Sequence, residues 1–433
     1  MLIKTLKSLL PSKITNPSGS EMRAMNPFWG GRAALLVRSG LDEFSHFSFY
    51  YRALAEAFAK RGIELSCHEI DSPNSDELSA LGEDPNLLFF LNFNGWATNL
   101  TRRDIGTSSA AARSFFTYFG KPLLDHFADP PFANEMQHAQ QFDIAERLVL
   151  YTDHTYLAWD GLYGPQRHSS YFLPQFVPLD KPSSPAIPFA ERSFHFLLPV
   201  SLYNPDMYYE SMLNAAPERS LGQALFDDLV GTFLNDPRSD AIQWVSHLWL
   251  RNGIPFDAHC VWQQRVMSAA WHYVKNRRRQ MILETLADVP LAIITKTIPY
   301  SIKLHPDSKV LAPRSFAELS AVVANTRVCI CPTPHTRGFH ERVLLAMSRG
   351  AVALTSPNQI CEENFCDGEE ILYFQDHGSD LLRKVQSCRE NWAATATIAS
   401  RGQQTQQARF SADNTVDHML RIVHNFHCRS QTP

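Results

Sequence analysis

The segment Val328–Ser356 constrains the fold more than any other part of this sequence. Val328–Cys331 is a short, continuous apolar run, which is typical of a parallel strand covered on both faces. A loop with two prolines follows, and from about His340 apolar residues recur at helical spacing as far as Gly350, a residue that favours the end of a helix. Ala351–Thr355 is the next apolar run. The pattern predicts a strand–loop–helix–strand unit of a parallel α/β sheet.

In such a unit the loop brings the helix N-terminus to the carboxyl edge of the sheet. Unpaired backbone N–H groups and the helix dipole favour an anionic phosphate there. Arg337, Gly338, Phe339, His340 and Arg342 all fall at this place. We therefore expect a phosphate-binding group in this loop and the first helical turn.

This unit resembles the donor-site segment of GT-B glycosyltransferases, most closely the bacterial glycosyltransferase-like proteins related to the spore maturation protein CgeB. Those proteins have an Arg, an apolar helical turn, a small residue and a Gly before a strand, which correspond to Arg342, Ala346, Gly350 and Ala351–Thr355 here. The acidic run in SPNQICEENFCDGEEILYF is also similar to theirs. The resemblance covers about residues 277–374. It implies an α/β chain of GT-B architecture, with two Rossmann-like domains that face a central cleft and bind a nucleotide-diphosphate-sugar.

The segment departs from the family at two positions. Many retaining relatives place one Glu near the donor sugar and a second on the nucleotide ribose, and Arg337 and Leu345 occupy those positions here. Glu341 lies one helical turn before Leu345 on the same helix face, so it is our candidate for the ribose or sugar contact. Alternatively, Glu341 is only a favourable first-turn acid at a helix N-terminus.

Composition excludes some classes of function. The chain has 433 residues, enough for two domains and an added helical layer, and its formal net charge of −4 predicts no binding to nucleic acid. The basic run Arg277–Arg279 is interpreted as a solvated helix face or the acceptor side of a cleft. No apolar run is long enough to span a bilayer. The N-terminal MLIKTLKSLLPSK is either a loosely ordered lead-in or a short amphipathic helix, so any membrane contact is expected to be peripheral at most.

The eight cysteines match no paired zinc pattern, and Cys329 and Cys331 fall inside the predicted strand. A reduced, cytoplasmic protein is the simplest account. No carboxylate pair of the metal-binding type stands in a convincing loop. We therefore expect no metal and no cofactor apart from the nucleotide sugar as co-substrate.

The first half of the chain predicts a second parallel sheet, with strands at 33–40, 63–70, 87–95 and in KPLLDHF and RLVLYT. Polar or small residues follow several of these strands and would meet at one sheet edge. On the acceptor side these are Gly40, Asn94 and Gly95, and the candidate catalytic groups are His126, Asp129 and His154. Each has a simpler interpretation, since an Asp before Pro forms turns and a His near a strand end is often structural.

The predicted organisation has five parts. They are a flexible lead-in at 1–30, an acceptor domain at 31–178 ending in the strand FLPQFVP, a Pro/Ser-rich linker at 179–188, a donor-binding domain at 189–390 and C-terminal helices at 391–433. Within the donor domain, 205–286 is a helical insertion whose aromatic residues are interpreted as packing faces. KVLAP at 309–313 is expected to be a loop before a helix, and by resemblance Val310–Pro313 would cover the nucleotide base. Lys296 and Lys303 are the charged candidates for the diphosphate.

Together these features predict a hexosyl- or related transferase that needs no metal. Arg337 and Arg342 would bind the diphosphate, Gly338–His340 would present N–H groups, and Glu341 would hold the ribose or sugar. His126, Asp129 or His154 would face an acceptor that is a glycan, a protein or a small molecule. Two alternatives remain open, a sugar-nucleotide epimerase of the same architecture and a non-catalytic scaffold that binds nucleotide sugars.

Overall fold

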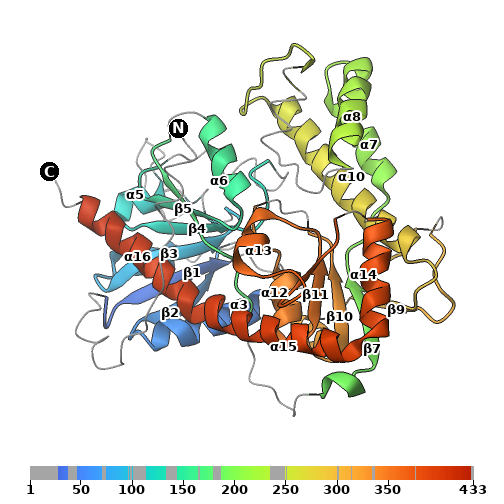
Figure 1. Ribbon diagram of the computed structural model, residues 1–433. Coiled ribbons are helices and arrows are strands. Elements are labelled where there is room, and N and C mark those ends of the chain that lie inside the picture. Colours follow the sequence, from blue (N-terminus) through green and yellow to red (C-terminus); the bar gives the residue numbers. More distant parts are fainter. Residues whose placement is uncertain are drawn as a thin grey trace.

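The computed structural model describes residues 28–37, 46–70, 75–95, 97, 100, 114–132, 144–163, 166–178, 187–234, 249, 251–299, 302–313, 315–333, 337–375 and 377–430. The N-terminal lead-in as far as residue 27, Gly40 and residues 179–186 of the predicted linker lie outside this part. Two parallel sheets of six strands each stand side by side, with helices on both faces (Figure 1).

The first sheet has the strand order β2-β1-β3-β4-β5-β6, and neighbouring strands pair in parallel. Its strands are β1 (Arg32–Val37), β2 (Glu64–Glu69), β3 (Leu87–Phe93), β4 (Leu123–Phe127), β5 (Arg147–Tyr151) and β6 (Ser169–Phe172). Every residue of β4 and β5 is buried, as expected for central parallel strands covered on both faces. The connecting helices are α3 (His46–Ala59), α4 (Ser75–Glu83), α5 (Phe115–Phe119), α6 (His154–Asp160) and the 3₁₀ turn η5 (Gly161–Tyr163).

The second sheet has the order β12-β11-β10-β7-β8-β9 and is also parallel throughout. Its strands are β7 (Phe194–Pro199), β8 (Ala292–Ile294), β9 (Lys309–Leu311), β10 (Thr326–Cys331), β11 (Val352–Thr355) and β12 (Leu372–Tyr373), after the 3₁₀ turn η6 (Phe189–Glu191). The helices that flank it include α11 (Phe316–Ala324), α12 (Glu341–Ser348), α13 (Gln359–Asn364) and α14 (Ser379–Glu390). Gly350 adopts φ +68° and ends α12, as its sequence position predicted.

Between β7 and β8 the chain forms several helices. They include α7 (Pro205–Ala215), α8 (Arg219–Phe233) and α10 (Val261–Thr285), which project beyond the second sheet in Figure 1. The end of α10 packs on that sheet through Ile282 and Leu283. Its earlier turns pack with Phe132 and Trp159 of the first half of the chain. Helix α10 therefore contacts both halves of the molecule.

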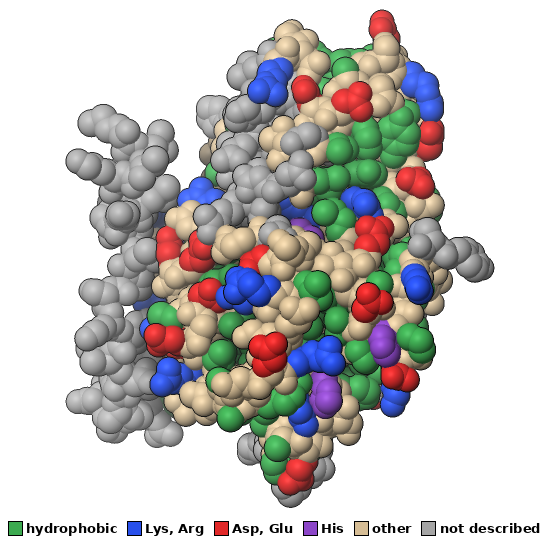
Figure 2. All heavy atoms as spheres, turned by 45° about the vertical axis from the view of Figure 1, so that its right-hand side comes forward, with side chains coloured by type: hydrophobic (Ala, Val, Ile, Leu, Met, Phe, Trp, Pro, Cys, Tyr) green, Lys and Arg blue, Asp and Glu red, His purple; other side chains and the backbone are tan. Residues whose placement is uncertain are grey.

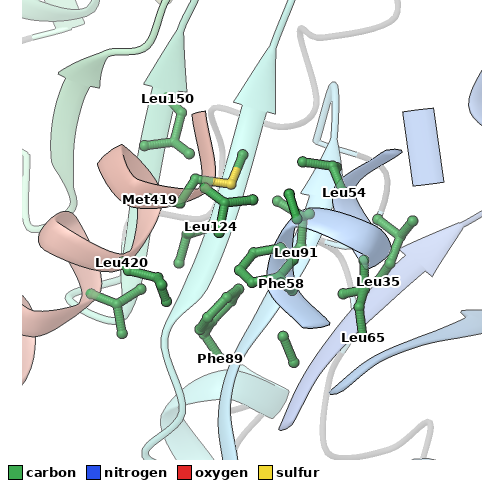
Figure 3. Close-up of a cluster of buried hydrophobic side chains, with 14 of the residues drawn as sticks. Leu35, Leu54, Phe58, Leu65, Phe89, Leu91, Leu124, Leu150, Met419 and Leu420 are labelled. Atoms are coloured by element: carbon green, nitrogen blue, oxygen red, sulfur yellow. The ribbon is translucent and has the colours of Figure 1, made fainter. Parts of the chain in front are cut away.

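The C-terminal helices α15 (Trp392–Arg409) and α16 (Ala412–Ser430) return from the second sheet to the first (Figure 1). Met419 and Leu420 of α16 pack against Leu124 and Leu150 of the first sheet (Figure 3). The Nε of Arg61 donates to Asp417 across 2.5 Å, which adds an ion pair to this contact. The C-terminal helix thus belongs to the core of the first sheet.

Two predicted elements were wrong. The FLPQFVP segment was expected to be a strand, but β6 ends at Phe172 and residues 173–178 lack strand structure. Lys309–Leu311 was expected to be part of a loop and instead forms the edge strand β9, which pairs with β8. A strand of three mostly exposed residues is too short to show an alternation of apolar and polar residues in the sequence. The change from one sheet to the other falls between Phe172 and Phe194, while the boundary at 179–188 stays a prediction.

Among the described helices, none combines the length and apolar character needed to cross a membrane.

Candidate functional site

Two loops, one from each sheet, meet at the carboxyl edges of the sheets. Asp153, just after β5, forms an antiparallel bridge with Gly338 of the loop that follows β10. The backbone N–H of His154 donates to the carbonyl of Arg337 across 3.1 Å. In return, the backbone N–H of Arg337 donates to the carboxylate of Asp153 across 3.2 Å. The sequence predicted functional groups at the carboxyl edge of each sheet. The structure brings His154 of the first sheet into contact with Arg337 of the second.

Asp153 is held in place by the helix that it begins. It is fully buried and caps α6, with its Oδ1 accepting the N–H of Thr155 across 2.6 Å. Its second oxygen remains directed at Arg337. Gly338 is required at the contact, because a Cβ on it would lie 2.4 Å from the carbonyl oxygen of Thr152. We expected Gly338 only to present its N–H group. Its lack of a side chain also lets the loop after β10 approach the loop after β5.

The exit of β3 is fixed by a buried ion pair. Asp125 and Arg147 are both fully buried, with a 2.8 Å contact between Nη2 and Oδ2. Asp125 also accepts the backbone N–H of Gly95 across 2.9 Å. Asn94 has a left-handed φ of 49°, and its side-chain amide donates to Asp129 across 3.2 Å. Gly95 and Asn94 are thereby held beside the exit of β4, where Asp129 lies.

The two candidate histidines lie in different surroundings. His126 is only 2% exposed, and burial lowers its pKa to about 4, so the ring is neutral at pH 7. Neither of its ring nitrogens has a hydrogen-bond partner among the described residues. The His154 ring is half-buried and stacks on Phe172 with ring centroids 3.8 Å apart. Burial and the neighbouring Arg337 lower the pKa of His154.

The predicted donor residues at the start of α12 differ in their burial and in their hydrogen-bond partners. Phe339 is buried with its ring against Phe365 and Phe410, so only its backbone faces the loop. His340 caps α12 by accepting the N–H of Arg342 across 3.2 Å. The guanidinium of Arg337 donates through Nε to Gln359 across 2.9 Å.

Glu341 and Leu345 face different environments. Glu341 is half-buried and lies close enough to Tyr50 of α3 to contribute, with burial, to raising the pKa of that hydroxyl. Leu345 is 2% exposed and belongs to the core around α12. A Glu at position 345 would therefore point into this core.

Sequence analysis missed a cluster of cations that lies between the two halves. Lys275 and Arg279 of α10 are within electrostatic range of each other and of Arg342 of α12, and Asp129 supplies the one opposing charge among the groups that shift Lys275. Arg279 is 2% exposed, and its Nη1 donates to the carbonyl of Ser201 across 2.7 Å. The Nη1 of Arg342 is buried and has no hydrogen-bond partner among the described residues. We call Lys275, Arg279 and Arg342 the cation cluster.

The cation cluster carries more positive charge than its surroundings neutralise. Burial, Arg279 and Arg342 lower the pKa of Lys275 to about 7, and its ammonium lies 4.3 Å from the ring centroid of Trp271. Burial and Arg342 lower the pKa of Arg279 to about 9. Burial, Lys275 and Arg279 lower the pKa of His272 to about 4. Burial is the largest cause of each shift, and the neighbouring cations add to it because they repel further positive charge.

The interpretation of Arg277–Arg279 as a solvated helix face was wrong for two of its residues. Arg278 is 8% and Arg279 is 2% exposed, because α10 is covered on most sides. Arg277 lies on the opposite side of the helix, where it pairs with Glu284 across 2.8 Å. The spacing of Lys275 and Arg279, four residues apart, was the available signal that both face one direction.

The remaining predicted donor residues lie in β9 and in the connection between β8 and β9. Lys296 and Lys303 are exposed on the loops after β8. Val310 in β9 is 49% exposed.

Within the described residues, no group of three or more His, Cys, Asp or Glu side chains is placed to hold a metal ion. None of the eight cysteines forms a disulfide.

Residues 277–421, which include α12 and much of the second sheet, match the family model described as glycosyl transferase-like. No curated protein sequence matches the chain. Sucrose-phosphate synthase of Thermosynechococcus elongatus has a similar structure, with a TM-score of 0.51 and 11% identity over 92% of this chain and 100% of that one. An α-glucosyltransferase solved with UDP-glucose and DNA gives a TM-score of 0.50 and 9% identity over 91% of this chain and 99% of that one. The chain therefore has the GT-B fold and carries a glycosyl transferase-like segment at residues 277–421.

Proposed function

We propose that this protein is a glycosyltransferase that moves a sugar from a nucleotide-diphosphate-sugar to an acceptor bound between the two sheets. The cation cluster carries the proposal, because its three cations lie within electrostatic range of one another and could together bind a polyanion such as a diphosphate. The glycosyl transferase-like segment contributes Arg342 and Arg279 to it. The similar α-glucosyltransferase was solved with UDP-glucose, which supports the same class of donor here.

In this proposal the cation cluster stabilises the departing diphosphate. Negative charge develops on the leaving group in the transition state, and preorganised cations in a buried site stabilise it strongly. The N–H groups at the start of α12 add the positive end of a helix dipole. Arg337 holds the loop in place through its backbone contacts with Asp153 and His154. We infer no need for a metal.

The acceptor would lie against the edge of the first sheet. Asp129 is half-buried, beside Asn94 and within range of Lys275, so it is the best placed group to accept a proton or a hydrogen bond from an acceptor hydroxyl. His154 is the next candidate. His126 would act only after a movement that opens its buried ring. Glu341 would contact the ribose or the sugar, and Val310–Pro313 would cover the base.

A thermal-shift panel of nucleoside diphosphates and nucleotide sugars tests this function. A donor at a hundredfold its dissociation constant should stabilise the folded chain by about 2.7 kcal/mol. We expect one base to be preferred, with the diphosphate contributing most of the effect. If no nucleotide raises the melting temperature, the chain keeps the fold without a donor site, and the transferase function is contradicted.

Product analysis separates the transferase from the epimerase. The preferred nucleotide sugar is incubated without any acceptor, and the sugar is identified after release. An epimerase would change the stereochemistry of the sugar in the absence of an acceptor. A transferase would leave the stereochemistry of the sugar unchanged. It would at most hydrolyse the nucleotide sugar slowly to the nucleoside diphosphate and the free sugar.

A further inference from the structure

A cavity lies apart from the cation cluster. It has a volume of about 630 Å³ and lies between the start of α7, one face of α10 and the loop after β8. This volume is typical of sites for small molecules. We call it the α7–α10 pocket.

The α7–α10 pocket and the cation cluster use opposite sides of α10. Tyr273, Arg277, Gln280 and Glu284 line the pocket and follow one another at intervals of three or four residues, so they share a helix face. Lys275 and Arg279 project on the other side of the helix at this spacing. A ligand in the pocket would therefore not occupy the proposed diphosphate site.

The charges of the pocket disfavour an anionic ligand. Arg277 is its one cation, and it is paired with Glu284 across 2.8 Å. Asp206 adds a further carboxylate from the first turn of α7. Figure 2 brings this side of the molecule forward, and its described surface shows acidic, basic and hydrophobic side chains interspersed. A phosphate or sulfate would meet an excess of negative charge here.

Several hydrogen-bonding groups of the pocket are available to a ligand. Among the described residues, none hydrogen-bonds to the carboxylate of Asp206, the hydroxyl of Tyr273 or the amide of Gln280. These groups include both donors and acceptors. Pro205, Ile298 and Pro299 add apolar surface to the same lining. Such a mixture fits a ring with many hydroxyl groups on its edge and C–H groups on its faces.

We propose that the α7–α10 pocket binds an uncharged, polyhydroxylated ligand, namely a segment of a neutral oligosaccharide. This site goes beyond the proposed transfer reaction, since it needs neither a donor nor catalysis. In a glycosyltransferase it would anchor a glycan at a distance from the reacting group. Helix α10 contributes residues to both sites.

Binding of neutral trisaccharides to the full chain tests this site. Maltotriose, cellotriose, mannotriose and chitotriose are titrated by calorimetry and by ligand-observed NMR. We expect at least one to bind, and we expect Tyr273→Phe and Gln280→Ala each to weaken it about fivefold, the effect of one neutral hydrogen bond. Tyr273→Phe keeps the ring that packs on Phe226, so loss of the fold is not a concern for it.

Lys275→Gln, on the opposite face of α10, is the matched control. It should leave trisaccharide binding unchanged while it weakens nucleoside diphosphate binding, and the two pocket variants should show the reverse pattern. The proposal is overturned if no trisaccharide binds at millimolar concentration, if the pocket variants bind as well as the parent, or if inorganic phosphate competes with the trisaccharide. Failure of the nucleotide panel would instead contradict the transferase function and leave this result standing.

Discussion

The carboxylate of Asp153 accepts the backbone N–H of Arg337 across 3.2 Å, and this contact joins a loop of the first sheet to a loop of the second. The antiparallel bridge between Asp153 and Gly338 reinforces it. Because α12 begins just after this loop, the position of the helix N-terminus depends on a residue from the other half of the chain. If α12 binds the donor as proposed, the junction links donor binding to the relative position of the two halves.

Gly338→Ala should disturb this junction. The new Cβ would lie 2.4 Å from the Thr152 oxygen and 2.8 Å from the Asp153 Cα, and both are backbone atoms that cannot rotate away. We expect kcat/KM to fall roughly tenfold to a hundredfold, as for other small displacements of reacting groups. Gly161→Ala is the control, since a Cβ there meets nothing within 4 Å and its φ is −62°. Equal activity of both variants would show that the junction has no role in transfer.

Donor binding should depend on pH through Lys275. The pKa of Lys275 in the folded chain is about 7, because burial and the neighbouring Arg279 and Arg342 oppose its charge. A bound diphosphate would favour the charged form, so binding above pH 7 should take up a proton and the affinity should fall as the pH rises through 7. The terminal phosphate, with a pKa of about 6, is already ionised in this range. His272, whose pKa is about 4, stays neutral throughout.

Calorimetry in buffers of different ionisation enthalpy measures this proton uptake. Lys275→Gln should abolish it and should make the affinity independent of pH near 7. Lys275 also links pH to stability, because its pKa is lowered from 10.5 to about 7 on folding and the unfolded chain binds more protons between these values. The stability contributed by this group therefore rises as the pH increases above 7. Binding without proton uptake in the parent would contradict the placement of Lys275.

Arg342→Ala should remove most of the affinity for a nucleoside diphosphate. Loss of a charge-assisted contact costs about 1.5 to 3 kcal/mol, or roughly tenfold to a hundredfold in affinity. Arg337→Ala is the comparison, because the side chain of Arg337 is engaged with Gln359 and its backbone makes the loop contacts. We expect the smaller effect from Arg337. If Arg342→Ala binds as tightly as the parent, the cation cluster is structural.

The sequence was informative for several elements whose local pattern determines their structure. Val328–Cys331 and Ala351–Thr355 were recognisable as buried parallel strands, and Gly350 as a helix end, because apolar runs and left-handed turns are encoded by neighbouring residues. The cluster of Lys275 and Arg279 was not recognisable. Helix α10 is buried on most sides, so its sequence does not reveal which face turns toward α12. That orientation is set by long-range packing against Phe132, Trp159 and the second sheet.

Limited proteolysis tests the predicted linker at 179–188. We expect the first cut there, because exposed Pro/Ser-rich connections are preferred sites of cleavage. The nicked halves should remain associated in solution, since α16 packs in the core of the first sheet and Asp417 pairs with Arg61. Denaturing gels would separate them. First cuts confined to 205–286 would contradict the boundary.

Leu345 and Glu341 test how this chain departs from the family pattern. Leu345 is 2% exposed in the core around α12, so Leu345→Glu would bury a carboxylate without a partner and should unfold the chain instead of restoring a ribose contact. Leu345→Met, which conserves volume, should cost less than about 1.5 kcal/mol.

Glu341→Gln should weaken donor binding by about 1.5 to 3 kcal/mol, the value of a charge-assisted hydrogen bond to a sugar hydroxyl. The same change should alter stability by only about 0.3 to 1 kcal/mol, the effect of a first-turn acid on its helix. Titration of the variant with a nucleoside and with its diphosphate measures the first effect, and thermal unfolding measures the second. Unchanged binding together with a small loss of stability would show that Glu341 only stabilises the start of α12, and the ribose would then have to be held by another residue.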